Sequence, residues 1–228
     1  SAYAPYGDQP INTIIERVHI LTQRLIAQDC DLIVVACNTA TVNVINELRA
    51  EYDALFVGVE PGIKPAVAAS NNRNVGVMVT QRTADSARFQ TFANSFLNQA
   101  NIHIQACPGL AECVEKLELA KPTTKQLVSR YVNSLLLKKV DTIVLGCTHY
   151  PFLQPLIDLV TPDGIRIINT NIAVAQQVER MVKPFEDNQE QPTGSFVVYT
   201  SGNQEKCQAA VSKLLTFPVT VYPLLSHS

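Results

Sequence analysis

The stretches Asp31-Leu-Ile-Val-Val-Ala-Cys37-Asn-Thr39 and Asp141-Thr-Ile-Val-Leu-Gly-Cys147-Thr-His149 share one pattern. Each has an aspartate, a run of four apolar or β-branched residues, one small residue, a cysteine and two polar residues. Because the runs do not alternate polar with apolar residues, they are typical of strands buried in a parallel sheet. Each cysteine then follows the carboxyl end of a strand, the edge where open α/β sheets bind ligands. Two such loops in one chain predict two thiols that face one pocket.

Composition narrows the class of protein. The chain has 228 residues, 46% of them hydrophobic and 17% charged, as in packed globular proteins. The net charge is −2 without a basic cluster, so no nucleic-acid partner is expected. The apolar runs are only as long as strands, and the N-terminus lacks a signal-peptide pattern. We therefore expect no membrane partner. Six scattered cysteines indicate reduced thiols in the cytoplasm.

Strand-like and helix-like segments alternate along the chain, which predicts an α/β fold with mostly parallel sheets. Strands are expected over residues 32–35, 55–59, 75–79, 102–106, 142–145, 166–168, 195–200 and 219–222. Helices are expected over residues 10–26, 41–50, 63–69, 110–119, 123–139, 171–183 and 203–215, with one from segment 80–86 to about 98 and one from Pro151. Segment 184–194 is predicted to be a polar surface loop.

The turn over residues 70–74 is the predicted domain boundary. The two cysteine loops lie 110 residues apart (147 minus 37), one on either side of it, and a long amphipathic helix precedes each. Two similar halves would place both loops at a shared cleft, where small-molecule sites are common.

Two thiols on opposite sides of one stereocentre can invert its configuration. A helix N-terminus after each cysteine is expected to lower the thiol pKa. The thiolate would take a proton from carbon while the other thiol gives one. Since neither a glycine-rich phosphate loop nor a pyridoxal lysine context is present, we expect no cofactor.

Less specific interpretations stand beside this one. A cysteine that ends an apolar strand is often a small buried hydrophobe, the interpretation preferred for Cys30, Cys107, Cys113 and Cys207. His149 either takes part in proton chemistry or is a structural loop histidine. The spacing of Cys37, Cys147 and His149 does not fit a zinc site, so no metal is expected. Glu60 and Glu115 are by pattern solvated or capping charges.

Several motifs point to a known family. They are Pro5-Tyr6-Gly7, Ala36-Cys37-Asn38-Thr39-Ala40, Glu60-Pro61, Thr80-x-x-Thr83-x-x-Ser86, Cys107-Pro108, Gly146-Cys147-Thr148-His149-Tyr150-Pro151 and Thr200-Ser201-Gly202. In these the chain resembles the amino-acid racemases that work without pyridoxal phosphate, most closely the glutamate racemases. His149 separates it from the aspartate racemases, which tend to carry an acidic residue there.

The resemblance implies two pseudo-symmetric three-layer α/β domains with the active site between them. The first would comprise residues 1–72 and 172–228, and the second residues 73–171. Cys37 and Cys147 would be the acid and base, with His149 assisting Cys147. The substrate-binding residues would be Tyr6, Gly7, Asn38, Thr39, Thr80, Thr83, Glu115 and Thr148. The implied reaction converts L-glutamate to D-glutamate for peptidoglycan, and a homodimer is expected.

Two departures from the family pattern leave alternatives open. Family members begin with a strand and an Asp-Ser-Gly loop ahead of Pro-Tyr-Gly, and this sequence starts after them, so Cys37 is expected to lack a partner and one sheet to have an open edge. Asn169-Thr170 also replaces the usual Asp-Ser. The first alternative is a catalytically impaired or non-catalytic glutamate-binding form. The second is a cysteine hydrolase with His149 as base.

Overall fold

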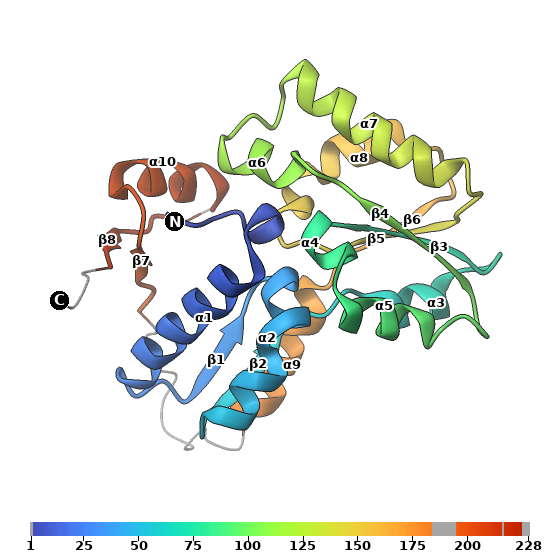
Figure 1. Cartoon of the computed structure of the whole chain (residues 1–228). Coiled ribbons are helices and arrows are strands. Elements are labelled where there is room, and N and C mark those ends of the chain that lie inside the picture. Colours follow the sequence, from blue (N-terminus) through green and yellow to red (C-terminus); the bar gives the residue numbers. More distant parts are fainter. Residues whose placement is uncertain (1, 184–194, 216, 225–228) are drawn as a thin grey trace.

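The computed structural model describes residues 2–183, 195–215 and 217–224, and its sheets are all parallel, as predicted (Figure 1). The predicted loop over 184–194 lies outside the described residues. All six cysteines are free thiols. In the part of the chain that is described, no helix has both the length and the apolar character needed to cross a membrane.

A four-stranded sheet forms the centre of the second half, in the order β4-β3-β5-β6. Its strands are β3 (Asn74–Val79), β4 (Asn101–Ala106), β5 (Thr142–Leu145) and β6 (Arg166–Ile168). Val77 of β3 lies opposite Val144 of β5 and Ile104 of β4, so the hydrophobic runs are in register. This is the largest sheet among the described residues, and β3 and β5 are its two central strands.

Helices cover both faces of this sheet and make three layers (Figure 1). On one face, Met78, Ile143 and Leu145 pack against Val132 of α7 (Pro122–Leu136) and Ile157 of α8 (Gln154–Val160). The other face packs in a second apolar cluster with α3 (Ile63–Ala69) and α5 (Ala87–Asn94). Since both faces are covered, the uninterrupted apolar sequence of β5 is fully buried, as expected of a parallel strand.

The first half is built on a smaller sheet of β1 (Leu32–Val35) and β2 (Leu55–Gly58). Between β1, α1 (Ile11–Ile26) and α2 (Asn38–Glu51) lies a third apolar cluster that includes Ile14, Ile33 and Leu48. Helix α9 (Asn171–Val182) contacts β2. Val34, in the middle of β1, is 39% exposed, so this strand is covered less completely than β5.

The end of the described chain forms a two-stranded sheet of its own. Strand β7 (Val198–Thr200) pairs with β8 (Val221–Pro223), and α10 (Gln204–Leu214) contacts β8. Among the described residues these strands pair with each other and not with β1 or β2. The assignment of residues 172–228 to the first domain, like the division at residue 72, stays a prediction.

Some helix bounds in the structure differ from the predictions. Segment 80–86 leads into α5, as predicted, and Ser86 caps the start of that helix by accepting a hydrogen bond from the Phe89 N–H. The segment also holds a short helix of its own, α4 (Gln81–Ala84), and α5 ends at Asn94, earlier than the predicted end near residue 98. Helix α6 (Leu110–Glu115) ends early, since Leu117 adopts a left-handed φ of 56°. The segments Tyr6–Asp8 (η1) and Tyr150–Leu153 (η2) are 3₁₀ turns.

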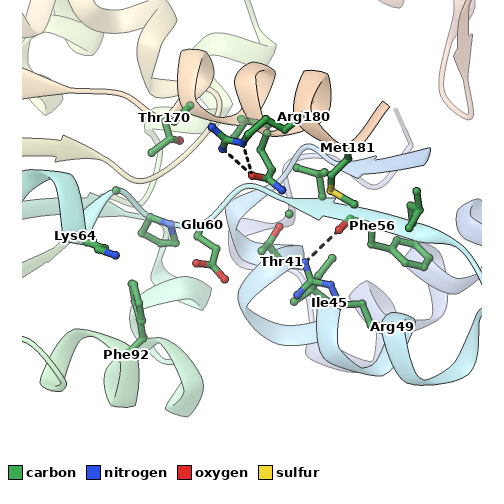
Figure 2. A pocket seen from close by; sticks show the side chains of 18 of the residues that line it. Thr41, Ile45, Arg49, Phe56, Glu60, Lys64, Phe92, Thr170, Arg180 and Met181 are labelled. Atoms are coloured by element: carbon green, nitrogen blue, oxygen red, sulfur yellow. Dashed lines mark hydrogen bonds between the residues drawn. The ribbon is translucent and has the colours of Figure 1, made fainter. Parts of the chain in front are cut away.

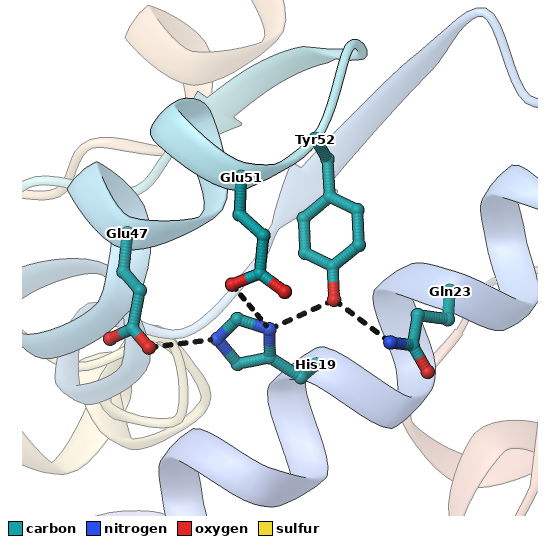
Figure 3. Close-up of polar contacts among 5 residues, drawn as sticks. All are labelled: His19, Gln23, Glu47, Glu51 and Tyr52. Carbon is teal, nitrogen blue, oxygen red and sulfur yellow. Dashed lines mark hydrogen bonds and ion pairs between the residues drawn. The ribbon is translucent and has the colours of Figure 1, made fainter.

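A polar cluster links α1 to the C-terminal end of α2 (Figure 3). The Nε2 atom of His19 lies 3.2 Å from Glu47, and its Nδ1 atom lies 3.6 Å from Glu51 and 2.9 Å from the Tyr52 hydroxyl. These are donor types that metals use. The two ring nitrogens face different carboxylates, however, so the arrangement is a polar cluster that links the two helices.

Candidate functional site

The two cysteine loops meet at the carboxyl ends of β1 and β5. Cys37 is the N-cap of α2, where its Sγ accepts a 3.5 Å hydrogen bond from the Ala40 N–H. Thr148, directly after Cys147, donates from its hydroxyl to the carbonyl of Ala36, directly before Cys37, at 3.2 Å. The predicted approach of the loops is therefore present in the structure as a direct hydrogen bond between them.

Both thiols have raised pKa values, which corrects the expectation that the helix N-termini would lower them. Burial raises the pKa of Cys37, against opposing hydrogen bonds from the N–H groups of Ala40 and Thr39. Burial also raises the pKa of Cys147 to about 12, and the charge of Cys37 adds to the increase. The helix ends act in the predicted direction, but desolvation of the sulfur is the larger effect. Both thiols are accordingly neutral near pH 7.

A chain of polar contacts leads outward from Cys147. His149 Nδ1 lies 3.7 Å from its Sγ, and His149 Nε2 lies 2.7 Å from the Glu115 carboxylate. The hydrogen bond to His149 holds the pKa of Glu115 below its ordinary value. The sequence pattern favoured a solvated or capping charge for Glu115, whereas the family resemblance placed it at the site. Glu115 is exposed and contacts His149, and its place in a substrate pocket stays a prediction.

Three predicted threonines form one buried hydroxyl cluster between the halves. Thr39 Oγ1 lies 2.9 Å from that of Thr80 and 3.1 Å from that of Thr83, and Thr80 donates to Thr83 at 3.0 Å. Gly7 packs against this cluster, because a Cβ atom there would lie 2.9 Å from the Thr80 side chain. The absence of a side chain at Gly7 is thus what permits η1 to approach α4.

The remaining predicted residues are Tyr6, in η1, and Asn38, the first residue of α2. Tyr6 is half-buried, and its pKa is raised by burial and by the charge of Cys37. Asn38 is buried and donates from its side-chain amide to the Val59 carbonyl at 2.8 Å. In this arrangement Asn38 holds the end of β2 beside the first cysteine loop.

Two smaller cavities are lined in part by predicted site residues. One, of about 10 Å³, lies where Gly7 and Asp8 meet Thr80, Cys107 and Glu112. The other, of about 400 Å³, lies between α10 and the segment that carries Glu115, Thr148 and His149. Asp8 and Glu112 were not predicted as site residues, although Glu112 and Glu115 are three apart on one helix and so face the same way.

A much larger cavity, of about 730 Å³, is lined by residues of α2, β2, α3 and α9 (Figure 2). Arg49 and Lys64 line it together with Glu60, and Arg49 donates to the Phe56 carbonyl. Arg180 donates to Gln177 at its rim. Neither Cys37 nor Cys147 lines this cavity, so size alone does not locate the site that the sequence predicts.

The chain is similar to known racemases over most of its length. The Asp/Glu/Hydantoin racemase family model matches residues 6–178. A glutamate racemase of Ectopseudomonas mendocina is 41% identical over 216 residues, which are 94% of this chain and 82% of that protein.

Solved structures agree with this relationship. Escherichia coli glutamate racemase, in complex with L-glutamate and the activator UDP-MurNAc-ala, has a TM-score of 0.81 and 27% identity over 98% of this chain and 86% of that chain. The fold also matches isoform RacE1 of Bacillus anthracis, with a TM-score of 0.87 and 23% identity over 97% of this chain and 84% of that one. This chain, with its paired cysteine loops, therefore belongs to the Asp/Glu/Hydantoin racemase family, among the glutamate racemases.

Proposed function

We propose that this chain interconverts L- and D-glutamate with Cys37 and Cys147 as the two acid–base groups. The observation that carries the proposal is the hydrogen bond from Thr148 to Ala36, which joins the two cysteine loops at one point. The family and its named relatives supply the substrate class. Two thiols on opposite sides of the α-carbon account for inversion without any further reacting group.

In this mechanism one sulfur acts as a thiolate and removes the α-proton, while the other thiol donates its proton to the opposite face. The sulfur that began as a thiolate ends as a thiol, and its partner ends as a thiolate. Burial makes each thiolate, once formed, a stronger base than an exposed one, which favours proton removal from a weak carbon acid. We expect kcat to increase with pH, because a raised thiol pKa leaves little thiolate near neutrality.

The substrate contacts follow from the same arrangement. We infer that Tyr6, Gly7, Asn38, Thr39 and Thr148 hold the carboxylates and ammonium group, with Thr80, Thr83 and Glu115 lining the pocket. His149 is the positioning partner of Cys147, since it links that thiol to Glu115. The product D-glutamate would supply peptidoglycan synthesis in the cytoplasm, and the chain would act as a homodimer, which sedimentation equilibrium can test.

Circular dichroism of L- and D-glutamate solutions tests the reaction directly. Wild-type protein should bring either enantiomer to the racemate, with solvent deuterium entering the α-position. Cys37→Ser and Cys147→Ser should each lose activity by about 10³-fold or more. Full activity in either variant would exclude the two-thiol mechanism. Binding of glutamate by the wild type without deuterium exchange would instead support the non-catalytic form.

A further inference from the structure

The first turn of α2, which carries Cys37 at its start, is tied to the ends of both strands of the smaller sheet. The Thr41 hydroxyl donates to the carbonyl of Val35, the last residue of β1, at 3.2 Å. The same hydroxyl accepts a hydrogen bond from the N–H of Val59, the first residue after β2, at 3.1 Å. Thr41 is 1% exposed, so both bonds are shielded from solvent. One side chain therefore fixes the start of the helix relative to the two strands.

Packing and further hydrogen bonds fix the same junction from other directions. A Cβ atom at Gly58 would lie 2.6 Å from the Thr41 methyl carbon, so α2 and β2 approach this closely only because Gly58 has no side chain. Asn38 donates to the Val59 carbonyl, so the first turn of α2 bonds both backbone polar groups of Val59. Arg88 of α5, in the second half, donates to the Thr41 carbonyl at 3.3 Å.

The position of this helical turn determines the surroundings of the Cys37 sulfur. The Thr41 N–H donates to the Cys37 carbonyl at 2.8 Å, which joins the two residues within the turn. The N–H groups of Ala40 and Thr39, in the same turn, donate to the sulfur and lower the pKa of Cys37 against the effect of burial. A shift of the turn would change both the reach of the sulfur and the hydrogen bonds that stabilise its thiolate, and proton transfer depends on both.

The second cysteine loop has no hydroxyl at the equivalent position. Pro151 lies four residues after Cys147, as Thr41 lies four residues after Cys37. Proline has no side-chain donor or acceptor, and the chain there forms the 3₁₀ turn η2. The hydroxyl of that loop belongs to Thr148, directly after the cysteine. An effect exerted through Thr41 should therefore act chiefly on Cys37.

We propose that Thr41 is a positioning residue for Cys37, and that its hydrogen bonds to the two strand ends hold this sulfur at the reacting carbon. The inference rests on the proposed function, because it takes Cys37 as one of the two acid–base groups. Thr41 acts through the backbone of α2 and needs no contact with the substrate. Its loss should therefore lower kcat and leave the KM for glutamate within about twofold of the wild-type value.

Thr41→Val removes the hydroxyl and keeps the branched shape of the side chain. We expect kcat to fall by about tenfold, less than the roughly 10²-fold that a misplacement of about 1 Å can cost. Thr41→Ser, which keeps the hydroxyl, should stay within about threefold of wild type. Thr124→Val is the matched control, because Thr124 is also fully buried and donates to the Glu118 carbonyl at 2.7 Å, outside both cysteine loops. Its kcat should follow wild type.

Two readouts respond to the position of the sulfur and not to a general loss of stability. The primary isotope effect with α-deuterated glutamate should increase in Thr41→Val only for the enantiomer whose proton Cys37 removes. His149→Ala, which acts on Cys147, should change the isotope effect for the other enantiomer. Alkylation of Cys37 by iodoacetamide at pH 8.5, followed by mass spectrometry of its peptide, should be about threefold slower in Thr41→Val, because the thiolate is the reacting form and loses its N–H donors. Cys147 in the same sample is the internal reference.

The alkylation readout separates this inference from the proposed function, since it needs no turnover. Wild-type protein that does not racemise glutamate would refute the proposed function, whereas the alkylation of Cys37 would still test Thr41. Unchanged kcat or unchanged Cys37 alkylation in folded Thr41→Val would overturn the positioning role, as would an equal loss of kcat in Thr124→Val. If Thr41→Val does not fold, Gly58→Ala pushes against the Thr41 methyl group with the hydroxyl intact. Slower alkylation of Cys37 in Gly58→Ala would support the role, and an unchanged rate would overturn it.

Discussion

The two cysteine loops have nearly the same sequence pattern but very different surroundings. Cys147 follows a fully buried strand of a four-stranded sheet and lies beside the His149–Glu115 pair. Cys37 follows β1, whose single neighbour among the described residues is β2. Apart from Cys147, the ionisable side chain whose pKa the charge of Cys37 raises is that of Tyr6. The same motif is therefore supported by a carboxylate and an imidazole on one side and by a phenol on the other.

This difference shows what a local motif determines and what it leaves to its context. The motif sets a strand, a cap and a thiol at a sheet edge in both halves. The acid–base character of each thiol depends on groups from other elements, such as α6 for Cys147. A symmetric reaction does not need symmetric support, since the two directions share one transition state.

Among changes around the two thiols, the largest expected effect comes from removing the imidazole beside Cys147. His149→Ala should lower kcat by about 10²-fold, because positioned acid–base partners contribute about 10²–10⁴-fold. Tyr6→Phe, the matched change beside Cys37, should alter kcat only a few-fold. Primary isotope effects with α-deuterated L- and D-glutamate add a sharper measurement. His149→Ala should change the isotope effect for one enantiomer only, and an equal change for both would show that His149 does not act through Cys147.

The next effect concerns stability and compares equivalent strand positions. Val144 in β5 is fully buried, whereas Val34 in β1 is 39% exposed. Val144→Ala should lower the free energy of unfolding by about 2 kcal/mol, from two lost methyl groups and the cavity they leave. Val34→Ala should cost less than about 0.5 kcal/mol. Urea unfolding measures the change in the free energy of unfolding for both variants. Equal changes would contradict the conclusion that β5 is more deeply buried than β1.

Much of the fold was predictable from sequence because the strands carry unbroken apolar runs. The predicted bounds of β1, β5, β6 and α3 match the structure. The helix predicted to follow segment 80–86 is present as α5, but it ends at Asn94 and not near Asn98, and the short helix α4 within that segment was not predicted. The raised thiol pKa values were also missed, since desolvation depends on residues distant in sequence.

The smallest expected effect concerns the aspartates that open the two motifs. Asp141 accepts hydrogen bonds from the Ser70 hydroxyl at 2.6 Å and from the N–H groups of Asn71 and Asn72 at 2.7 and 2.8 Å, so it holds the turn between the halves. Asp31 is exposed, and its carboxylate has no hydrogen bond among the described residues. Asp141→Asn should lower the free energy of unfolding by about 1 kcal/mol. This is less than the three hydrogen bonds would contribute if they were fully buried. Asp31→Asn should change stability by less than about 0.5 kcal/mol.

The pH dependence of unfolding identifies the cause of that difference. Burial alone would raise the pKa of Asp141, but the hydrogen bonds from Ser70, Asn72 and Asn71 outweigh it and place the pKa below the ordinary value of 3.8. A lowered folded-state pKa contributes stability that is fully present above the unfolded value and is lost as the pH falls through the folded value. The difference in stability between wild type and Asp141→Asn should therefore be constant from pH 7 to about 5 and shrink below pH 4. Urea midpoints measured at pH 7, 5 and 3 give this difference, with Asp31→Asn as the control. A difference that persists unchanged at pH 3 would show that Asp141 stabilises the turn through its shape and not through its charge.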